Sequence, residues 1–308
     1  MLTWASNIRL PKSTRVKLGD RDPERRKQGL EELAALPHGS AIKVTLRALD
    51  DPVSNVREAA IFSLSGSKSR RALKLLVKAL RHKSPKVRFG AATALGVRAG
   101  TIVEERSRAF DAVSAALNTE HDRNAAVAMA MALHNTQDSR ALDKLLTLLR
   151  SRYSVSQRAS ITALMLFEDP LTFDPLAAAL KNSYDAGVMK AAATALASLG
   201  DPRAVDEILC KLRGLSTSST DATFDAMFSH FLSALRHIEH PGRSERLILG
   251  LDDGEQPVRC LAAMALGFSG DVRAEEALKK LLSDKDPGLR RAAESGLQDL
   301  KRALRPGG

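Results

Sequence analysis

The chain repeats itself at an interval of about 31 residues. The stretch KVRFGAATALGVRAG at 86–100 is closely matched by PVRCLAAMALGFSGD at 257–271. Val-Arg or Leu-Arg pairs of this kind end at Arg57, Arg88, Arg259 and Arg290, and both neighbouring pairs are 31 residues apart. A period of roughly 20–50 residues predicts a solenoid, because a short unit can bury its apolar face only by stacking on its neighbours. The spacings leave room for about nine such units in the 308 residues.

Each unit is predicted to contain two helices. An Asp or Ser followed by Pro marks the start of the second helix, because the side-chain oxygen accepts from free backbone amides and Pro fits the first turn. These starts are Asp22-Pro23, Asp51-Pro52, Ser84-Pro85 and Asp286-Pro287. After the Asp51 start, small and apolar residues from Val56 to Leu64 recur at helical spacing. Gly96 and Gly267 are predicted to end two second helices as left-handed caps.

The first helix of a unit opens on an Arg-Ala pair, such as Arg71-Ala72 or Arg203-Ala204, ahead of leucines at helical spacing. Aromatic residues are only 4% of the chain, and alanine and leucine are abundant. This composition favours helices that pack closely through small residues over a sheet, which needs Val, Ile and Tyr. The predicted fold class is therefore all-α.

Three stretches carry a family resemblance: DPVSNVREAAIFSL at 51–64, GDPRAVDEILCKL at 200–212 and EQPVRCLAAMALGFSGD at 255–271. They resemble HEAT repeats of the short bacterial type, whose name comes from the phycobilin lyases. The resemblance covers roughly residues 20–300. It implies a right-handed α-α superhelix, a HEAT-like α-solenoid, of about nine helix-pair repeats. It says little about function, because such arrays host many unrelated activities.

The domain organisation follows from that array. Residues 1–19 are predicted to form a basic N-terminal segment that caps the first unit through Trp4, Ile8 and Leu10, although a peptide that engages a partner or a membrane is the alternative. Residues 20–300 form the array, and 301–308 a C-terminal tail. The insertion GLSTSSTDA at 214–222 breaks the period, and its Ser and Thr content predicts an exposed loop.

The arginines of the Val-Arg pairs need a counter-charge. A cation in the first turn opposes the helix dipole at a cost of about 0.3–1 kcal/mol. The nearest acids lie in the turns, and the HEAT resemblance implies a ladder of Asp and Arg that ties neighbouring units together. The predicted ladder residues are Arg57, Arg88, Arg259, Arg290, Asp22, Asp51 and Asp286. We therefore interpret these arginines as structural rather than as phosphate ligands.

The positive charge is concentrated in the first third of the chain. Residues 1–100 hold 21 Lys or Arg against 8 Asp or Glu, whereas the chain as a whole has a net charge of +11. The exposed cations predicted for residues 67–98 are Arg70, Lys74, Lys78, Arg81, Lys83 and Lys86. They are expected to dock an anionic partner, which could be an acidic protein, a nucleic acid or a membrane surface. The alternative is a solvated face that keeps the protein in solution.

The second helices are expected to line the concave side of the solenoid. Phe62 and Met264 point away from the core by alignment, and Phe89 lies in the row four residues earlier. Exposed apolar side chains on a groove suit a protein partner, such as a helix or peptide. The alternative is that they pack against the helix of the next unit.

No enzyme signature emerges. The iron-binding HEAT enzymes carry His-Glu pairs, which this chain lacks, and the HEAT-like alkylpurine glycosylases need an aromatic cleft, whereas the single tryptophan, Trp4, precedes the array. A weak metal candidate is His230, His237 and His240, which share one helical face. There is no glycine-rich phosphate loop. We predict no catalytic residue and no cofactor.

The sequence therefore predicts a non-enzymatic HEAT-repeat scaffold or adaptor that mediates protein–protein interactions. The alternatives are a nucleic-acid-binding array, such as a DNA-repair factor, and a lyase-type or metal-dependent HEAT enzyme. No apolar run approaches the ~20 residues of a membrane span, which predicts that the chain is not an integral membrane protein. Cys210 and Cys260 form no disulfide framework, which favours a cytoplasmic location.

Overall fold

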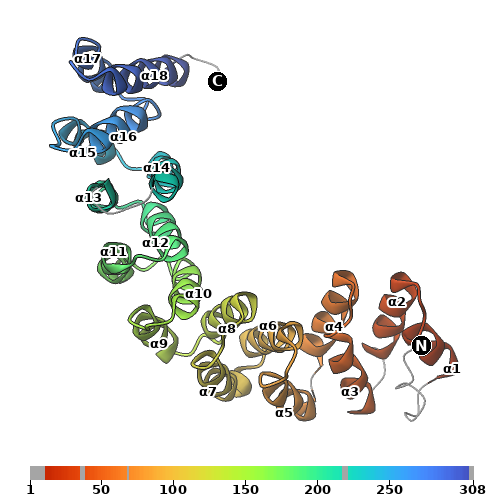
Figure 1. Cartoon of the computed structure of the whole chain (residues 1–308). Helices are drawn as coiled ribbons and strands as arrows, with labels where there is room; N and C mark the ends of the chain where they lie inside the picture. The colour runs from red at the N-terminus through yellow and green to blue at the C-terminus, as the bar shows by residue number, and fades with distance from the viewer. Residues whose placement is uncertain (1–10, 35–38, 68, 217–220, 305–308) are drawn as a thin grey trace. The chain divides into compact units, whose positions relative to one another are not determined.

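A computed structural model describes residues 11–34, 39–67, 69–216 and 221–304. These residues form eighteen α-helices and two short 3-10 helices, with no strand among them (Figure 1). The helices follow one another as nine helix pairs, so the predicted all-α solenoid is confirmed. No helix in the described ranges is both long and apolar enough to cross a membrane.

The chain divides into two compact units, residues 1–167 and 168–308. The first unit contains α1 (Lys12–Leu18), α2 (Pro23–Ala34), α3 (Gly39–Ala48), α4 (Ser54–Gly66), α5 (Arg70–Ala79), α6 (Pro85–Thr101), α7 (Arg106–Leu117), α8 (Arg123–Asn135), α9 (Arg140–Leu149) and α10 (Ser154–Leu164). The second contains α11 (Phe173–Asn182), α12 (Ala186–Ser198), α13 (Arg203–Ser216), α14 (Asp221–Arg236), α15 (Gly242–Gly250), α16 (Gln256–Leu266), α17 (Val272–Leu281) and α18 (Pro287–Ala303). The 3-10 helices are η2 (Val103–Glu105) and η3 (Pro170–Thr172).

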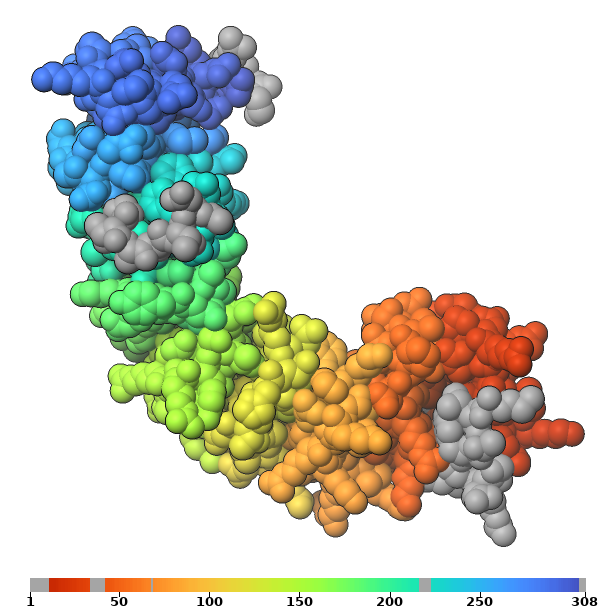
Figure 2. All heavy atoms as spheres, viewed as in Figure 1, coloured from red at the N-terminus to blue at the C-terminus, as the bar shows by residue number. Residues whose placement is uncertain are grey.

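Within each unit the pairs stack in series. In the first unit α2, α4, α6, α8 and α10 pack one upon the next, and in the second α12, α14, α16 and α18 do so. First helices also pack on first helices, as α3 does on α5 and α13 on α15. The space-filling view shows successive pairs of a unit in continuous contact (Figure 2). The second helices therefore form the continuous spine of each unit.

Small residues let these spine helices approach closely. Ala92, Ala126 and Ala263 are fully buried at the contacts. Two glycines predicted as left-handed caps serve the same purpose, so that prediction is wrong. Gly96 lies inside α6, where an added Cβ would come within 2.9 Å of the Cα of Ala132. Gly267 ends α16 with a φ of −57°, and its added Cβ would lie 2.7 Å from a backbone oxygen of α18.

Some predicted boundaries shift. Trp4, Ile8 and Leu10 lie outside the described residues; of the predicted N-terminal segment the structure describes α1, which packs on α2. The predicted tail from residue 301 starts inside α18, which continues to Ala303. The insertion at 214–222 is only in part a connection, because α13 runs to Ser216 and α14 begins at Asp221.

Candidate partner-binding surfaces

Five arginines occupy the same first-turn position in their second helices: Arg26, Arg57, Arg88, Arg259 and Arg290. In each, Nη1 donates to two main-chain carbonyls of the preceding turn at 2.8–3.1 Å. These carbonyl oxygens carry partial negative charge, so they offset the unfavourable position of a cation at a helix N-terminus. The shared role of these arginines is to fix the turn that precedes their helix.

Two of the five also bind a carboxylate in the turn before the second helix of the next pair, a contact that we call a rung. Arg26 donates to both carboxylate oxygens of Asp51 at 2.8 and 2.9 Å, and both side chains are buried. Arg88 donates to both oxygens of Glu120 at 2.7 and 2.8 Å. The carboxylates raise the pKa of both arginines. Burial acts to raise the pKa of Glu120, but hydrogen bonds from Arg88 and from two backbone amides hold it below its ordinary value.

The predicted ladder is therefore only partly correct in its partners. Of the predicted acids, Asp51 forms a rung, but with Arg26. Asp22 and Asp286 accept from backbone amides at the starts of their own helices, and Asp286 also accepts from Gln256 Nε2 of the preceding pair at 3.4 Å. Arg57, Arg259 and Arg290 make no ion pair within the described part of the chain. The sequence prediction missed Glu120, because no Val-Arg pair follows it.

The predicted basic residues form an exposed, unpaired segment. Arg70, Lys74, Lys78, Arg81, Lys83 and Lys86 are all exposed, and we call them the basic segment. None of their side chains makes an ion pair or hydrogen bond with the residues that the structure describes. No described carboxylate therefore offsets the charge of these cations, and their side chains are open to solvent.

The basic segment departs from the pattern of the other first helices. When the first helices are aligned by their buried residues, one exposed position near the start carries Asp111, Asp143, Asp174, Asp206, Glu245 and Glu276 in α7, α9, α11, α13, α15 and α17. Several of these acids pair with the following first helix, as Asp111 does with Arg140 at 2.9 Å. In α3 and α5 the same position carries Lys43 and Lys74. The exposed side of these two helices has therefore changed sign.

A second departure lies two residues before the opening arginine of α5. Arg140, Arg203 and Arg273 are each clamped by an aspartate two residues earlier, at 2.7–2.8 Å. The pairing lowers the pKa of that aspartate, to about 2 at Asp271. The equivalent of this aspartate before Arg71 is Ser69, which caps the helix but carries no charge. Arg71 is exposed and unpaired among the described residues.

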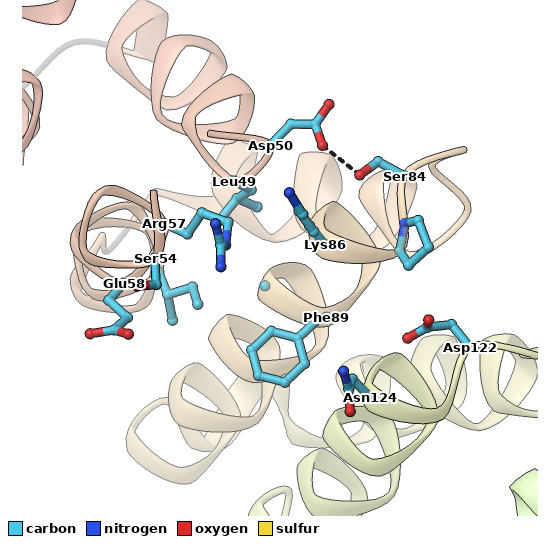
Figure 3. Close-up of a pocket in the computed structure, with 13 residues that line it drawn as sticks. Leu49, Asp50, Ser54, Arg57, Glu58, Ser84, Lys86, Phe89, Asp122 and Asn124 are labelled. Carbon is cyan, nitrogen blue, oxygen red and sulfur yellow. Dashed lines mark hydrogen bonds between the residues drawn. The ribbon is translucent and has the colours of Figure 1, made fainter. Parts of the chain in front are cut away.

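A groove of about 690 Å³ lies on the second helices beside the basic segment (Figure 3). Its wall is formed by Leu49, Asp50, Ser54, Arg57, Glu58, Ile61, Ser84, Pro85, Lys86, Phe89, Gly90, Asp122 and Asn124. These residues come from the starts of α4, α6 and α8 and the turns before them. Ser84 Oγ donates to Asp50 Oδ1 at 2.5 Å, which ties two of the turns together. We call this feature the Phe89 groove.

Apolar side chains are exposed along this part of the spine. Phe62 on α4 is 82% exposed and Phe89 is 40% exposed, so neither packs fully against the next helix. Met264 belongs to the other compact unit and is half-buried, and its neighbour Cys260 is buried. Of the three predicted apolar contacts, the structure brings Phe62 and Phe89 to the exposed surface of one unit.

The three candidate metal ligands are not brought together. His230 Nε2 lies 3.0 Å from the carbonyl of Lys190, and His237 Nδ1 lies 2.6 Å from that of Ser233. His240 Nδ1 accepts from the amide of Gly242. Within the described ranges, no three His, Cys, Asp or Glu side chains are placed to hold a metal ion. The weak metal candidate is therefore wrong as an assembled site.

Two buried arginines were missed because their sequence context resembles that of any surface arginine. Arg98 is completely buried and donates to both oxygens of Glu105 at 3.0 and 2.7 Å. Arg243 donates to the carbonyls of Arg236 and Phe268 at 2.8 and 2.9 Å, and burial lowers its pKa. Both hold helix ends together and are structural.

Comparison with known proteins agrees with this architecture. The profile of HEAT repeats matches residues 14–96, 45–133, 74–165, 142–213 and 244–303. The curated proteins contain no match to this sequence.

Among solved structures, YibA of Escherichia coli is similar, with 15% identity, a TM-score of 0.51, and coverage of 92% of this chain and 99% of that one. Kap95p, solved with RanGDP, is similar over 94% of this chain and 43% of its own, with 13% identity and a TM-score of 0.53. The CpcE–CpcF phycocyanin lyase of Nostoc sp. PCC7120 has 20% identity over 74% of this chain and 94% of that one, with a TM-score of 0.37. The first two likenesses concern the fold, and together with the repeat profile they lead to one conclusion: the chain belongs to the HEAT-repeat family.

Proposed function

We propose that the protein is a non-enzymatic scaffold or adaptor that binds an anionic partner through the basic segment. The observation that carries the proposal is the loss of pairing in α5. From α7 onward, the position of Lys74 carries an acid, and before three first helices the position of Ser69 carries an aspartate that pairs with the opening arginine. Lys74 and Ser69 replace these acids in α5. Like charges at Lys74 and Lys78, one turn apart, slightly destabilise a helix, so local stability does not account for them.

A second contact surface runs along the second helices. Phe62 and Phe89 present exposed apolar area beside the groove, which suits a helix or peptide of a protein partner. A stacked array displays such surfaces on a continuous core, so binding needs no chemistry. Two free thiols, Cys210 and Cys260, fit a location in the reducing cytoplasm.

Nucleic acid is the alternative anionic partner. Residues 67–98 hold one aromatic side chain, Phe89, whereas proteins that bind single-stranded nucleic acid stack successive bases on several aromatic side chains. Contact with phosphates alone would make the logarithm of affinity fall by about 0.9 per phosphate contacted against the logarithm of salt concentration. The remaining alternative is a lyase-type or metal-dependent enzyme, and metal analysis of the purified protein tests its metal-dependent version.

The test compares two triple variants of the full chain. Lys74→Glu/Lys78→Glu/Arg81→Glu reverses the basic segment, and Lys181→Glu/Lys285→Glu/Lys301→Glu makes the same change in net charge at exposed sites in the other unit. Fluorescence anisotropy measures binding of a labelled poly-glutamate peptide and of a labelled DNA duplex. We expect the first variant to lose peptide binding and the second to retain it. Equal binding by both variants would contradict the proposal, and tighter, steeply salt-dependent duplex binding would favour the nucleic-acid alternative.

A further inference from the structure

The turns before eight of the second helices follow one rule. In each, the residue six positions before the fourth residue of the helix, which is the first-turn arginine in five of them, accepts the backbone amide two residues after itself at 2.8–3.2 Å. These residues are Asp20, Asp51, His82, Glu120, Ser151, Ser183, Asp253 and Asp284. Five of the eight are acids. The side chain at this position therefore holds the turn, and an acid there is also available to the preceding helix pair.

In two units that acid also makes the rung. Asp51 reaches back to Arg26, and Glu120 reaches back to Arg88, whereas Asp284 makes no ion pair with Arg259 among the described residues. His82 stands where the rung to Arg57 would come from, and its Nδ1 accepts from the amide of Ser84 at 3.1 Å. His82 thus keeps the turn but supplies no carboxylate. The Nε and Nη2 edge of Arg57 has no partner among the residues described here.

Arg57 is one of the residues that line the Phe89 groove. Arg57, Lys86 and the ring of Phe89 lie next to one another, and Asn124 lies on the other side of the ring (Figure 3). A guanidinium edge of this kind binds a carboxylate through two parallel hydrogen bonds, as it does at Arg26 and Arg88. The neighbouring ring offers apolar contact, and Asn124 can both donate and accept.

We propose that the Phe89 groove binds an acidic side chain of a partner protein, with the carboxylate on Arg57 and Lys86 and an adjacent apolar side chain on Phe89. The inference rests on the proposed function and names the partner's chemistry at one site. Arg57 and Lys86 make no ion pair among the described residues, so the carboxylate of the occupant is matched to these two side chains and not to the groove wall as a whole. Asp50, Glu58 and Asp122 also lie in the wall, so the groove disfavours a continuous run of phosphates and suits a peptide with isolated acids.

The experiment restores the missing rung. His82→Asp places a carboxylate where Asp51 and Glu120 stand in their units, and Asp can still accept the Ser84 amide. His82→Asn keeps that turn bond but adds no charge, so it is the matched control. The probe is a short fluorescein-labelled peptide in which glutamates alternate with leucines, and a second peptide replaces the glutamates with glutamines. Anisotropy gives the affinities, and urea unfolding reports the fold of each variant.

We expect the wild type and His82→Asn to bind the Glu-Leu peptide and not the Gln-Leu peptide. His82→Asp should bind it at least about tenfold more weakly, a change of about 1.4 kcal/mol, with an unchanged or higher urea midpoint. Equal binding by His82→Asp and wild type, equal loss in both His82 variants, equal binding of both peptides, or displacement of the peptide by duplex DNA would each overturn this site. If reversal of the basic segment still abolishes poly-glutamate binding, the proposed function stands without it. If neither the Glu-Leu peptide nor poly-glutamate binds any form of the protein, the groove site and the proposed function both fail.

Discussion

The rung between Arg88 and Glu120 gives the sharpest stability prediction, through Glu120→Gln. The carboxylate is 3% exposed and accepts two hydrogen bonds from Arg88, as well as the amides of His121 and Asp122 at 2.9 and 2.8 Å. Glutamine has almost the same shape, and its oxygen can still accept both amides. Its NH2 group then faces the guanidinium, so two donors meet and the charge of Arg88 loses its counter-charge.

The size of the loss in stability depends on the solvent exposure of Arg88 and on the hydrogen bonds that it keeps in the variant. Removing one partner of a fully buried ion pair costs about 3–5 kcal/mol. Arg88 is 18% exposed, and its Nη1 keeps the carbonyls of His82 and Lys83. We therefore expect a loss of about 2–4 kcal/mol in the free energy of unfolding of the first unit.

The assay is urea unfolding followed by far-ultraviolet circular dichroism. Long repeat arrays can unfold in stages, so amide hydrogen exchange in α6 and α8 resolves the local effect. Glu276→Gln is the control, because the same substitution removes an exposed pair, Lys280–Glu276, whose atoms are 3.8 Å apart and which is worth at most about 0.5 kcal/mol. Equal midpoints for Glu120→Gln and Glu276→Gln would refute the rung as a link between helix pairs.

Three further predictions follow from the same contacts. The destabilisation by Glu120→Gln should shrink as the pH falls from ~4.3 through the folded-state pKa of Glu120, which lies below its ordinary value. The reason is that the wild-type protein also loses the ion pair with Arg88 when Glu120 is protonated. Unfolding curves at successive pH values measure the difference. Gly296→Ala should destabilise the second unit, since its Cβ would lie 2.4 Å from a backbone oxygen of α16, whereas Gly214→Ala, with nothing within 4 Å, should stabilise by about 0.5–1 kcal/mol; thermal melts that rank them the other way would contradict the packing. Arg98→Met should cost about 3–5 kcal/mol by leaving a buried carboxylate unpaired, and a midpoint near wild type in urea would show that this pair is dispensable.

The sequence was sufficient for the array and insufficient for its pairings. The 31-residue period and the apolar faces predict the helix pairs, because buried apolar residues recur along the sequence at helical spacing. The partner of each arginine depends on which turn the next pair brings beside it, and that register is set by packing. Arg88 therefore pairs with Glu120, whose own helix carries Ala126 at the arginine position. Gly96 likewise reports a close approach to Ala132 that no local pattern encodes.

The basic segment was predicted correctly as exposed, since cations at one-turn spacing on an amphipathic helix face solvent. Its lack of partners could not be predicted with the same force. An acid near the start of a first helix pairs only if the neighbouring helix brings a cation beside it, as Arg140 is brought beside Asp111. The contrast between Lys74 and the acids of α7 and the later first helices becomes visible only when these helices are aligned by their buried residues.

The central claim is that the binding surface consists of cations that lack the acidic partners found at the matching positions of other helix pairs. The most direct measurement is binding of labelled poly-glutamate to Ser69→Asp/Lys74→Asp, which introduces the residues found at the matching positions 201, before α13, and 206, within it. The account predicts clearly weaker binding with an unchanged or higher urea midpoint, because Arg71 gains the clamp that Asp201 gives Arg203. Binding as tight as that of the wild type, in a variant that folds equally well, would contradict it.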